Sequence, residues 1–232
     1  MRFEIGNWDF HNQGKSLARS VSGKVLTEIY DNLYQAFGSQ HWWPGDSSFE
    51  VAVGAILTQN TNWGNVEKAI ENIRAKKALD AGSLHKMPHK KLASLIRPAG
   101  YFNVKAKRLK AFLAFLCNDY NGSMQQMKKS DTLSLRKRLL AVHGIGPETA
   151  DSILLYALDR PVFVIDAYTK RVMSRHRLVS EKAGYQEIQE LFHKNLSADV
   201  QLFNEYHALF VMAGKDYCKP KPRCTGCPLQ FI

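Results

Sequence analysis

Apolar side chains recur every three or four residues along most of the chain, which is the spacing of an amphipathic helix. The clearest run extends from Leu26 to Phe37, and Gly38 ends it. Val162–Ile165 is a short β-branched run and the one strand candidate. The pattern predicts an all-α chain of roughly ten helices. They fall at 26–37, 47–57, 63–73, 88–97, 106–116, 135–140, from 147 onward, and at 168–175, 185–196 and 202–212.

Local signals mark where some of these helices begin. Ser47 followed by Glu50 has the form of a capping box. Pro88 suits the first turn of the helix that Pro98 ends. In the helix at 106–116 the basic residues lie off the apolar stripe, so they are expected on its other faces. They are Lys105, Lys107, Arg108 and Lys110.

The composition is that of a basic globular protein. The 232 residues are 45% hydrophobic and 23% charged, with 32 Lys and Arg against 21 Asp and Glu, a formal charge of +11. Such an excess favours a polyanionic partner. The longest apolar runs, Val51–Leu57 and Ala111–Cys117, fall far short of the roughly 18 residues that a membrane span needs. Residues 1–22 are predicted to be an irregular leader without the apolar core of an export signal.

A glycine-rich turn between two predicted helices is the most informative stretch. Residues 139–153 are predicted to run helix, turn, helix, with Gly144 and Gly146 in the turn and Pro147 opening the second helix. Two glycines let the backbone turn tightly and approach another chain. The free N–H groups at such a helix start, near Thr149, form an anion site that suits a DNA phosphate. The alternative is an ordinary helix–helix turn.

A single acid, Asp166, stands between the β-branched run and the helix at 168–175. Asp is a preferred N-cap residue, because its carboxylate accepts hydrogen bonds from free backbone N–H groups. A capping carboxylate is held rigidly and can still face a cleft. Both roles therefore stay open for Asp166.

Several segments together resemble the helix-hairpin-helix (HhH-GPD) glycosylases of the endonuclease III superfamily. They are the hairpin at Gly144–Pro147, the segment Pro161–Asp166 and the cysteine-rich tail. The resemblance runs from about Trp42 to the C-terminus. Further stretches are most similar to the endonuclease III-related branch that includes bacterial 3-methyladenine DNA glycosylase III. These are His41–Pro44, Phe49, Leu57–Thr61 and Arg97–Arg108.

The resemblance implies a two-lobed all-α fold with DNA bound between the lobes. One lobe is a six-helix barrel at 40–160, with the helix-hairpin-helix at about 135–158. The other combines 23–39 with 161–232 and ends in a Cys-rich loop at 218–227. The implied protein is a monomeric base-excision-repair glycosylase that acts on damaged double-stranded DNA. It is expected in the cytoplasm, associated with the nucleoid when on DNA.

The resemblance also implies roles for individual residues. The family's catalytic carboxylate falls on Asp166, and its helix-opening Gln, which fills the gap left by a flipped base, falls on Gln59. The hairpin amides are expected to hold the phosphate backbone, with a monovalent cation bound at the hairpin. The expected DNA contacts are Gln59, Gly144, Ile145, Gly146, Thr149 and Lys170.

One departure from the family pattern bears on the mechanism. Bifunctional members carry a nucleophilic Lys two positions after the second hairpin glycine, where this chain has Glu148. A carboxylate cannot form the Schiff base that an amine forms. The prediction is therefore a monofunctional glycosylase that uses water and lacks AP-lyase activity. Lys170 is interpreted as a surface or phosphate contact rather than a nucleophile.

The tail carries three cysteines, Cys218, Cys224 and Cys227. Relatives with a 4Fe–4S cluster have four, with a first gap of six residues where this chain has five. Their fourth cysteine would fall at position 233, beyond the last residue of this sequence. The leading prediction is a 4Fe–4S cluster on these three thiolates with another ligand. Zinc with His207 as fourth ligand, or no metal, are the alternatives, and Cys117 is expected in the core.

Three of the four Trp residues flank the stretch that the resemblance places at the base pocket. Trp42, Trp43 and Pro44 precede the first barrel helix, and Trp63 follows the turn containing Asn60. An aromatic wall stacks on any base and favours a cationic one further. Alkylated purines such as 3-methyladenine are therefore the predicted substrates. Uracil or thymine in mispairs, other lesions of the endonuclease III kind, and a non-catalytic DNA-binding role are the alternatives.

Overall fold

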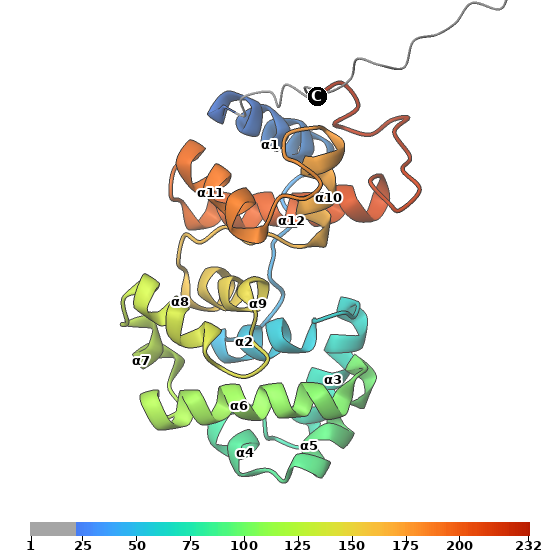
Figure 1. The fold of residues 1–232 in the computed structure, drawn as a ribbon. Helices are drawn as coiled ribbons and strands as arrows, with labels where there is room; N and C mark the ends of the chain where they lie inside the picture. The colour runs from blue at the N-terminus through green and yellow to red at the C-terminus, as the bar shows by residue number, and fades with distance from the viewer. Residues whose placement is uncertain (1–21) are drawn as a thin grey trace, which may run out of the picture.

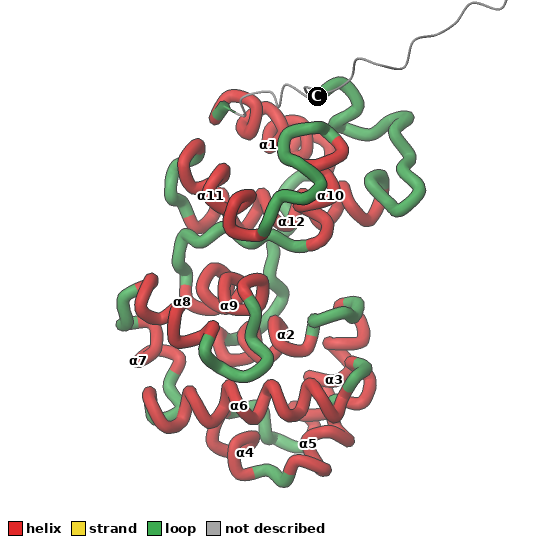
Figure 2. Tube along the Cα trace, viewed as in Figure 1, coloured by secondary structure: helices red, strands yellow, loops and turns green. Residues whose placement is uncertain are grey.

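The structure is a computed structural model that describes residues 22–232. The predicted leader at 1–22 lies outside the described residues except for Ser22. The described part is helical without strands, which confirms the all-α prediction (Figure 2). Its elements are α1 (Gly23–Phe37), α2 (Ser48–Leu57), α3 (Trp63–Ala75), α4 (Ala81–Lys86), α5 (His89–Leu95), a 3₁₀ turn (Arg97–Ala99), α6 (Phe102–Tyr120), α7 (Met124–Lys128), α8 (Thr132–Leu140), α9 (Pro147–Ser152), a π-helical segment (Ile153–Ala157), α10 (Ala167–Arg175), α11 (Tyr185–Asn195) and α12 (Val200–Asp216).

The helices form two groups (Figure 1). Helices α2 to α9 make up one lobe, and α1 packs with α10, α11 and α12 in the other, although α1 is far from them in sequence. Two extended segments join the lobes, one between α1 and α2 and the other before α10. The first lobe is built around α2, in which every residue from Glu50 to Leu57 is buried. Helix α2 contacts α3, α6, α9 and the π-helical segment, so its apolar run from Val51 to Leu57 is explained by burial against several neighbours.

Short polar side chains begin half of the helices. Each accepts a hydrogen bond from a free backbone N–H group, which stabilises a helix by about 1 kcal/mol. The predicted cap at Ser47 is present, because its hydroxyl accepts from the Glu50 N–H at 3.2 Å. Glu50 does not complete a reciprocal box; its carboxylate instead pairs with Arg74 at 2.8 Å. The full set of such caps is Ser47, Asn62, Asp80, Ser123, Asp131, Asp166 and Asp199.

The strand candidate Val162–Ile165 is wrong. The segment is extended and buried, but it has no neighbouring strand within residues 22–232. Side chains of α11 satisfy its backbone instead. His193 accepts from the Phe163 N–H at 2.9 Å, and the Tyr185 hydroxyl accepts from the Ile165 N–H at 3.3 Å. The β-branched run is thus a buried connection between the lobes.

Lys105 does not lie on an exposed face of its helix. Only 1% of it is exposed, and its ammonium donates to the Leu57 carbonyl at 2.8 Å and the Ala99 carbonyl at 2.7 Å. Burial, and secondarily the charge of Arg108, lower the pKa of Lys105 to about 8. Lys105 therefore satisfies carbonyl groups at the ends of two helical elements, a role that sequence spacing does not reveal.

Candidate active site

A pocket of about 730 Å³ opens between the two lobes. Its walls come from the segment before α2, the loop between α2 and α3, the start of α9, the segment that enters α10, and α12 with the tail after it. The side chains that matter below are Trp42, Trp43, Gln59, Asn60, Trp63, Glu148, Asp166, Arg171, His207, Lys215 and Lys219. Seven of the predicted site residues, including Thr149, therefore share one cavity, although they come from distant parts of the chain.

Asp166 is the N-cap of α10 and also lines the pocket. One carboxylate oxygen accepts from the Thr169 N–H at 2.7 Å, and the other lies 3.7 Å from the His207 ring nitrogen Nε2. The side chain is 12% exposed, so it is largely enclosed but open to the cavity. The two roles proposed for an acid at this position, cap and cleft carboxylate, are geometrically compatible. The cap keeps the carboxylate in one orientation.

A buried Tyr–His pair stands behind Asp166. Tyr156 comes from the π-helical segment and His207 from α12, and the Tyr156 hydroxyl hydrogen-bonds to His207 Nδ1. His207 Nε2 has no hydrogen-bond partner and points at Asp166 from 3.7 Å. Burial lowers the pKa of His207, with Asp166 acting in the opposite direction, so the ring is neutral near pH 7.

The zinc alternative required His207 as a metal ligand, but its ring lies against Tyr156 and Asp166 instead. His207 is a neighbour of the candidate catalytic carboxylate, and nothing in the spacing of the sequence signals that pairing. Tyr156 is a second site residue that sequence reasoning missed. Its position follows from the wider turn of the π-helical segment, which sequence periodicity does not predict.

Glu148 brings a second carboxyl group to the pocket. It lies in the first turn of α9, directly after the hairpin. Its side chain is exposed, and it lines the cavity that Asp166 also faces. Desolvation there, with Asp166 as the next contribution, raises the pKa of Glu148 to about 7. The position where bifunctional relatives of the predicted family carry a nucleophilic Lys is therefore occupied by a partly protonated acid.

Aromatic rings form one side of the pocket. The Trp43 ring packs edge to face on Trp63 with centroids 5.3 Å apart, and it lies 5.1 Å from Tyr156. Trp42 contacts Trp43 at 5.5 Å, and the Lys215 ammonium lies 5.8 Å from the Trp42 ring. Gly54 permits this packing on α2, because a Cβ there would come within 3.3 Å of Trp43 and Trp63. Exposed Asn60 adds an amide to the same cavity.

The hairpin is tied to the loop after α2 through Gln59. The Gln59 amide donates to the Gly144 carbonyl at 3.1 Å and to the Thr149 hydroxyl at 2.8 Å, and its oxygen accepts from Arg108. Thr149 and Ile145 are buried at this junction. The predicted contact of Gln59 with DNA therefore requires that it exchange these bonds for contacts with the nucleic acid.

The two hairpin glycines differ in backbone conformation and in the space around them. Gly144 has φ of +83°, and a Cβ there would lie 2.2 Å from Arg108 Cγ. Gly146 is the N-cap of α9 in an extended conformation that any residue adopts, and a Cβ there would meet nothing within 4 Å. Gly144 is thus required by the turn itself, whereas Gly146 leaves open space in front of the helix start.

Two of the predicted site residues lie differently from the expectation. The Lys170 ammonium donates to the Ala183 carbonyl at 2.8 Å, so it ties α10 to the following loop. Pro44 does not line the pocket of Asp166. It borders a second, more polar pocket of about 640 Å³ next to α3.

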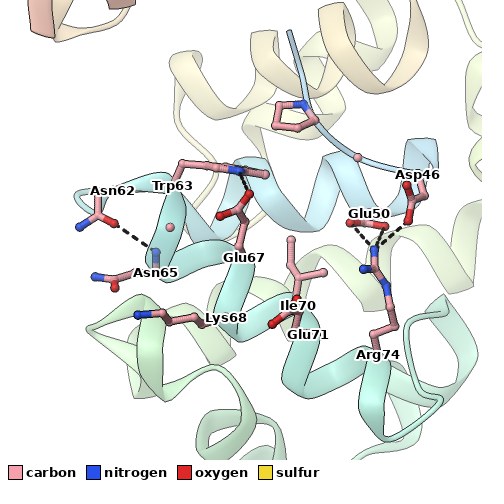
Figure 3. A pocket seen from close by; sticks show the side chains of 13 residues that line it. Asp46, Glu50, Asn62, Trp63, Asn65, Glu67, Lys68, Ile70, Glu71 and Arg74 are labelled. Carbon is pink, nitrogen blue, oxygen red and sulfur yellow. Dashed lines mark hydrogen bonds and ion pairs between the residues drawn. The ribbon is translucent and has the colours of Figure 1, made fainter. Parts of the chain in front are cut away.

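Figure 3 shows the second pocket. Arg74 points at both Asp46 and Glu50 across it, at 2.9 and 2.8 Å. The indole N–H of Trp63 donates to Glu67 at 2.8 Å. Trp63 lines both pockets and so stands at the boundary between them. Three of the six charged residues of the second pocket, Asp46, Glu50 and Arg74, pair with one another.

The cysteine tail does not assemble a metal site in this structure. Among residues 22–232 no group of three or more His, Cys, Asp or Glu side chains is arranged to hold a metal ion. Arginines of α10 hold the tail: Arg175 contacts Cys218 Sγ at 3.4 Å, and Arg171 donates to the Cys218 carbonyl. The predicted 4Fe–4S cluster and the zinc alternative are not established by this arrangement, and both stay predictions. No chemical step below depends on either.

No helix in the described part is long and apolar enough to cross a membrane. The H. pylori 3-methyladenine DNA glycosylase bound to 1,N6-ethenoadenine has a similar structure, with a TM-score of 0.72 and 28% identity, covering 84% of this chain and 98% of that one. A trapped endonuclease III–DNA covalent intermediate gives a TM-score of 0.77 at 21% identity, over 90% and 94% of the two chains, which supports the fold.

A protein of Methanocaldococcus jannaschii, provisionally named as a DNA repair glycosylase, is 49% identical over 209 residues, 89% of this chain and 94% of its own length. The sequence model of the HhH-GPD superfamily of base excision DNA repair proteins matches residues 53–198, from the middle of α2 to the loop before α12. The resemblance predicted from the hairpin and the Asp166 segment is confirmed, and with it DNA as the partner. This chain belongs to the HhH-GPD superfamily of base excision DNA repair proteins.

Proposed function

We propose that this chain is a monofunctional DNA N-glycosylase that releases damaged bases by hydrolysis at Asp166. Cationic alkylated purines such as 3-methyladenine are its preferred substrates. The observation that carries the proposal is the carboxylate of Asp166, fixed by its cap and facing a cavity of about 730 Å³ beside aromatic rings. A cavity of that size accommodates a nucleobase and part of its sugar.

The chemistry follows from what a glycosidic bond requires. Work on a base in a duplex begins with its extrusion from the stack, at a few kcal/mol. Cleavage of the bond to the base builds positive charge on the sugar, which a fixed carboxylate stabilises. Asp166 also accepts a proton from the attacking water. His207 supports this role as a positioning residue, since its ring nitrogen Nε2 faces the second carboxylate oxygen at 3.7 Å.

Monofunctional action is supported by Glu148. No lysine lines the cavity at the hairpin, and the lysines that do line it, Lys215 and Lys219, come from the far side. Borohydride trapping tests this directly. We expect no covalent protein–DNA adduct, and an abasic product that breaks only on alkali treatment. Efficient trapping would contradict the proposal, and an endonuclease III-type bifunctional enzyme is the positive control.

Preference for a cationic purine is supported by the ring cluster of Trp42, Trp43 and Trp63. A desolvated cation over an aromatic face gains about 2 kcal/mol. A cationic base also leaves as a neutral molecule. The test is chromatography of bases released from methylated DNA and from duplexes with uracil or mispaired thymine. We expect 3-methyladenine to be released fastest. Release of uracil without 3-methyladenine would contradict the substrate but not the glycosylase activity.

Contact with the DNA backbone is proposed at the hairpin, where Gly146 leaves the start of α9 uncovered. Phosphate contacts position the duplex without reading its sequence. Gly144 and Ile145 hold the turn, and Thr149 and Gln59 brace it against the loop after α2. A monovalent cation at the hairpin remains part of this proposal, to be tested by the dependence of DNA affinity on K⁺ against Li⁺ at constant ionic strength.

A further inference from the structure

The pocket of Asp166 contains a second acid that hydrolysis at Asp166 does not use. Glu148 stands on the cavity wall at the start of α9, while Asp166 faces the same cavity from the start of α10. Within residues 22–232 the Glu148 carboxyl group engages in no ion pair and no side-chain hydrogen bond. An acid without a partner in a substrate-sized cavity is free to contact whatever enters.

The two carboxyl groups have different surroundings. Asp166 accepts a backbone N–H and faces the His207 ring, so its carboxylate is held in one orientation. Glu148 has neither, and its pKa rises to about 7 through desolvation and the Asp166 charge. A fixed carboxylate that faces the same cavity as a carboxyl group with a raised pKa suits a division of roles between a base and an acid.

Uncharged damaged purines need such an acid. A cationic base departs as a neutral molecule, but an uncharged base departs as an anion unless a ring nitrogen or exocyclic oxygen receives a proton. Protonation of a leaving group by a positioned acid accelerates a reaction by about 10² to 10⁴. Glu148 and the aromatic rings line the same cavity, so a base that stacks on the rings shares that cavity with Glu148.

We propose that Glu148 is the proton donor to uncharged leaving bases, so that this pocket accepts neutral purine adducts as well as cationic ones. The inference rests on the proposed glycosylase function. In the step, the proton of the Glu148 carboxyl group moves to the base as the bond between C1′ and the base nitrogen breaks. The bonding electron pair goes to the base, water attacks C1′, and its proton goes to Asp166. One proton then returns from solvent to Glu148 and one leaves Asp166, which restores the enzyme.

Six other ionisable side chains line this cavity with Glu148. They are Asp166 before α10, Tyr168 and Arg171 on α10, His207 and Lys215 on α12, and Lys219 in the tail. Desolvation, and after it the charge of Asp166, disfavour ionised Glu148. His207 is neutral because burial lowers its pKa. The group expected to lose its proton as the pH rises through about 7 is therefore Glu148.

Glu148→Gln tests the proposal, because it keeps the shape and removes the proton. Single-turnover base release is measured from duplexes with hypoxanthine or 1,N6-ethenoadenine, both uncharged, and from methylated DNA, which supplies cationic purines. We expect release of the uncharged bases to fall by about 100-fold or more, and release of 3-methyladenine to change by less than about threefold. For wild type, release of uncharged bases should decline as the pH rises above about 7, and the variant should lack that decline.

Glu187→Gln is the matched control, since Glu187 is also an exposed acid in the first turn of a helix, α11, but does not line the pocket. Equal losses on both lesion classes, no loss on either, or a wild-type enzyme that releases only cationic bases would each overturn the role of Glu148. A wild-type enzyme that releases no base at all would instead overturn the proposed function. Circular dichroism and binding to undamaged duplex verify that the variant folds.

Discussion

Two aspartates near the junction of the lobes show how differently one residue type is used. Asp151 on α9 is fully buried and accepts from two nitrogens of Arg136 at 2.6 and 2.9 Å. The Tyr185 hydroxyl and the Gln189 amide donate to it at 2.8 and 2.7 Å. Because Arg136 is on α8 while Tyr185 and Gln189 are on α11, this network joins the two lobes.

Asp166 is the opposite case. It has one backbone donor, a histidine at 3.7 Å and an open face toward the cavity. A carboxylate accepts about four hydrogen bonds, so most of the capacity of Asp166 is unused by the protein. The comparison teaches that the number of hydrogen bonds a carboxylate accepts from the protein, rather than its burial or residue type, distinguishes the two acids. Asp151 accepts many and holds the fold, whereas Asp166 accepts few and is available to substrate. The predictions below challenge that distinction.

Asp166→Asn should have the largest effect. Loss of the charge that stabilises the sugar is expected to reduce single-turnover base release by about 10³-fold. Asn is an equally good N-cap, so the free energy of unfolding should change by less than about 1 kcal/mol. Kinetics and urea unfolding measure the two quantities. A near-normal rate would remove Asp166 from catalysis.

Asp151→Ala should show the reverse pattern. It leaves the Arg136 charge and two polar groups without their partner, which typically lowers the free energy of unfolding by about 3–5 kcal/mol. Base release per folded molecule should stay close to wild type at low temperature. Arg136→Met combined with Asp151→Leu should recover much of the stability, because no charge is then left buried and unpaired. Stability unchanged in the single variant would contradict the comparison.

The hairpin glycines give a smaller effect. Gly146→Val should fold normally, since the position is open and extended, and should weaken binding to every duplex by about 1–2 kcal/mol through lost phosphate contact. Gly144→Val, strained at φ of +83° and against Arg108, should instead lower the thermal midpoint. Fluorescence anisotropy at fixed salt distinguishes the two. Normal affinity in a folded Gly146→Val protein would contradict the proposed contact.

His207→Asn should slow base release about tenfold, because Asp166 loses the ring that faces it at 3.7 Å and is held less firmly in its orientation. Tyr156→Phe should have part of that effect by releasing the histidine ring. Both variants should keep the wild-type affinity for undamaged duplex, whereas a general structural defect would lower that affinity. If rate and affinity fall together in both variants, the pair is structural rather than positioning.

The smallest effect concerns stability and Glu148. A carboxyl group whose pKa is raised in the folded state binds its proton more tightly there, so its contribution to stability is present below its ordinary pKa and is lost as pH rises through about 7. Glu148→Gln should therefore gain stability relative to wild type as the pH rises through that window. Glu187→Gln should show no such trend. Parallel pH profiles for Glu148→Gln and wild type would contradict the raised pKa.

The sequence alone was sufficient wherever the signal is local. Apolar spacing predicted α1 and the other helices longer than two turns. It missed α4 and α7, because each has only two buried residues, too few to show a helical period. Ser47 and Asp166 were identifiable as caps because the bond they form spans three residues. Gly144 was identifiable because a left-handed turn excludes side chains.

Only the tertiary structure decided which distant groups meet. Lys105 is buried because two helix ends present carbonyl groups to it, and Val162–Ile165 is not a strand because side chains of α11 take its hydrogen bonds. Tyr156 and His207, 51 positions apart, form the pair behind Asp166. Hydrophobic periodicity determines which face of a helix is buried but not which neighbour covers it. The chemistry of this pocket depends on those neighbours, through desolvation and the charges that they bring together.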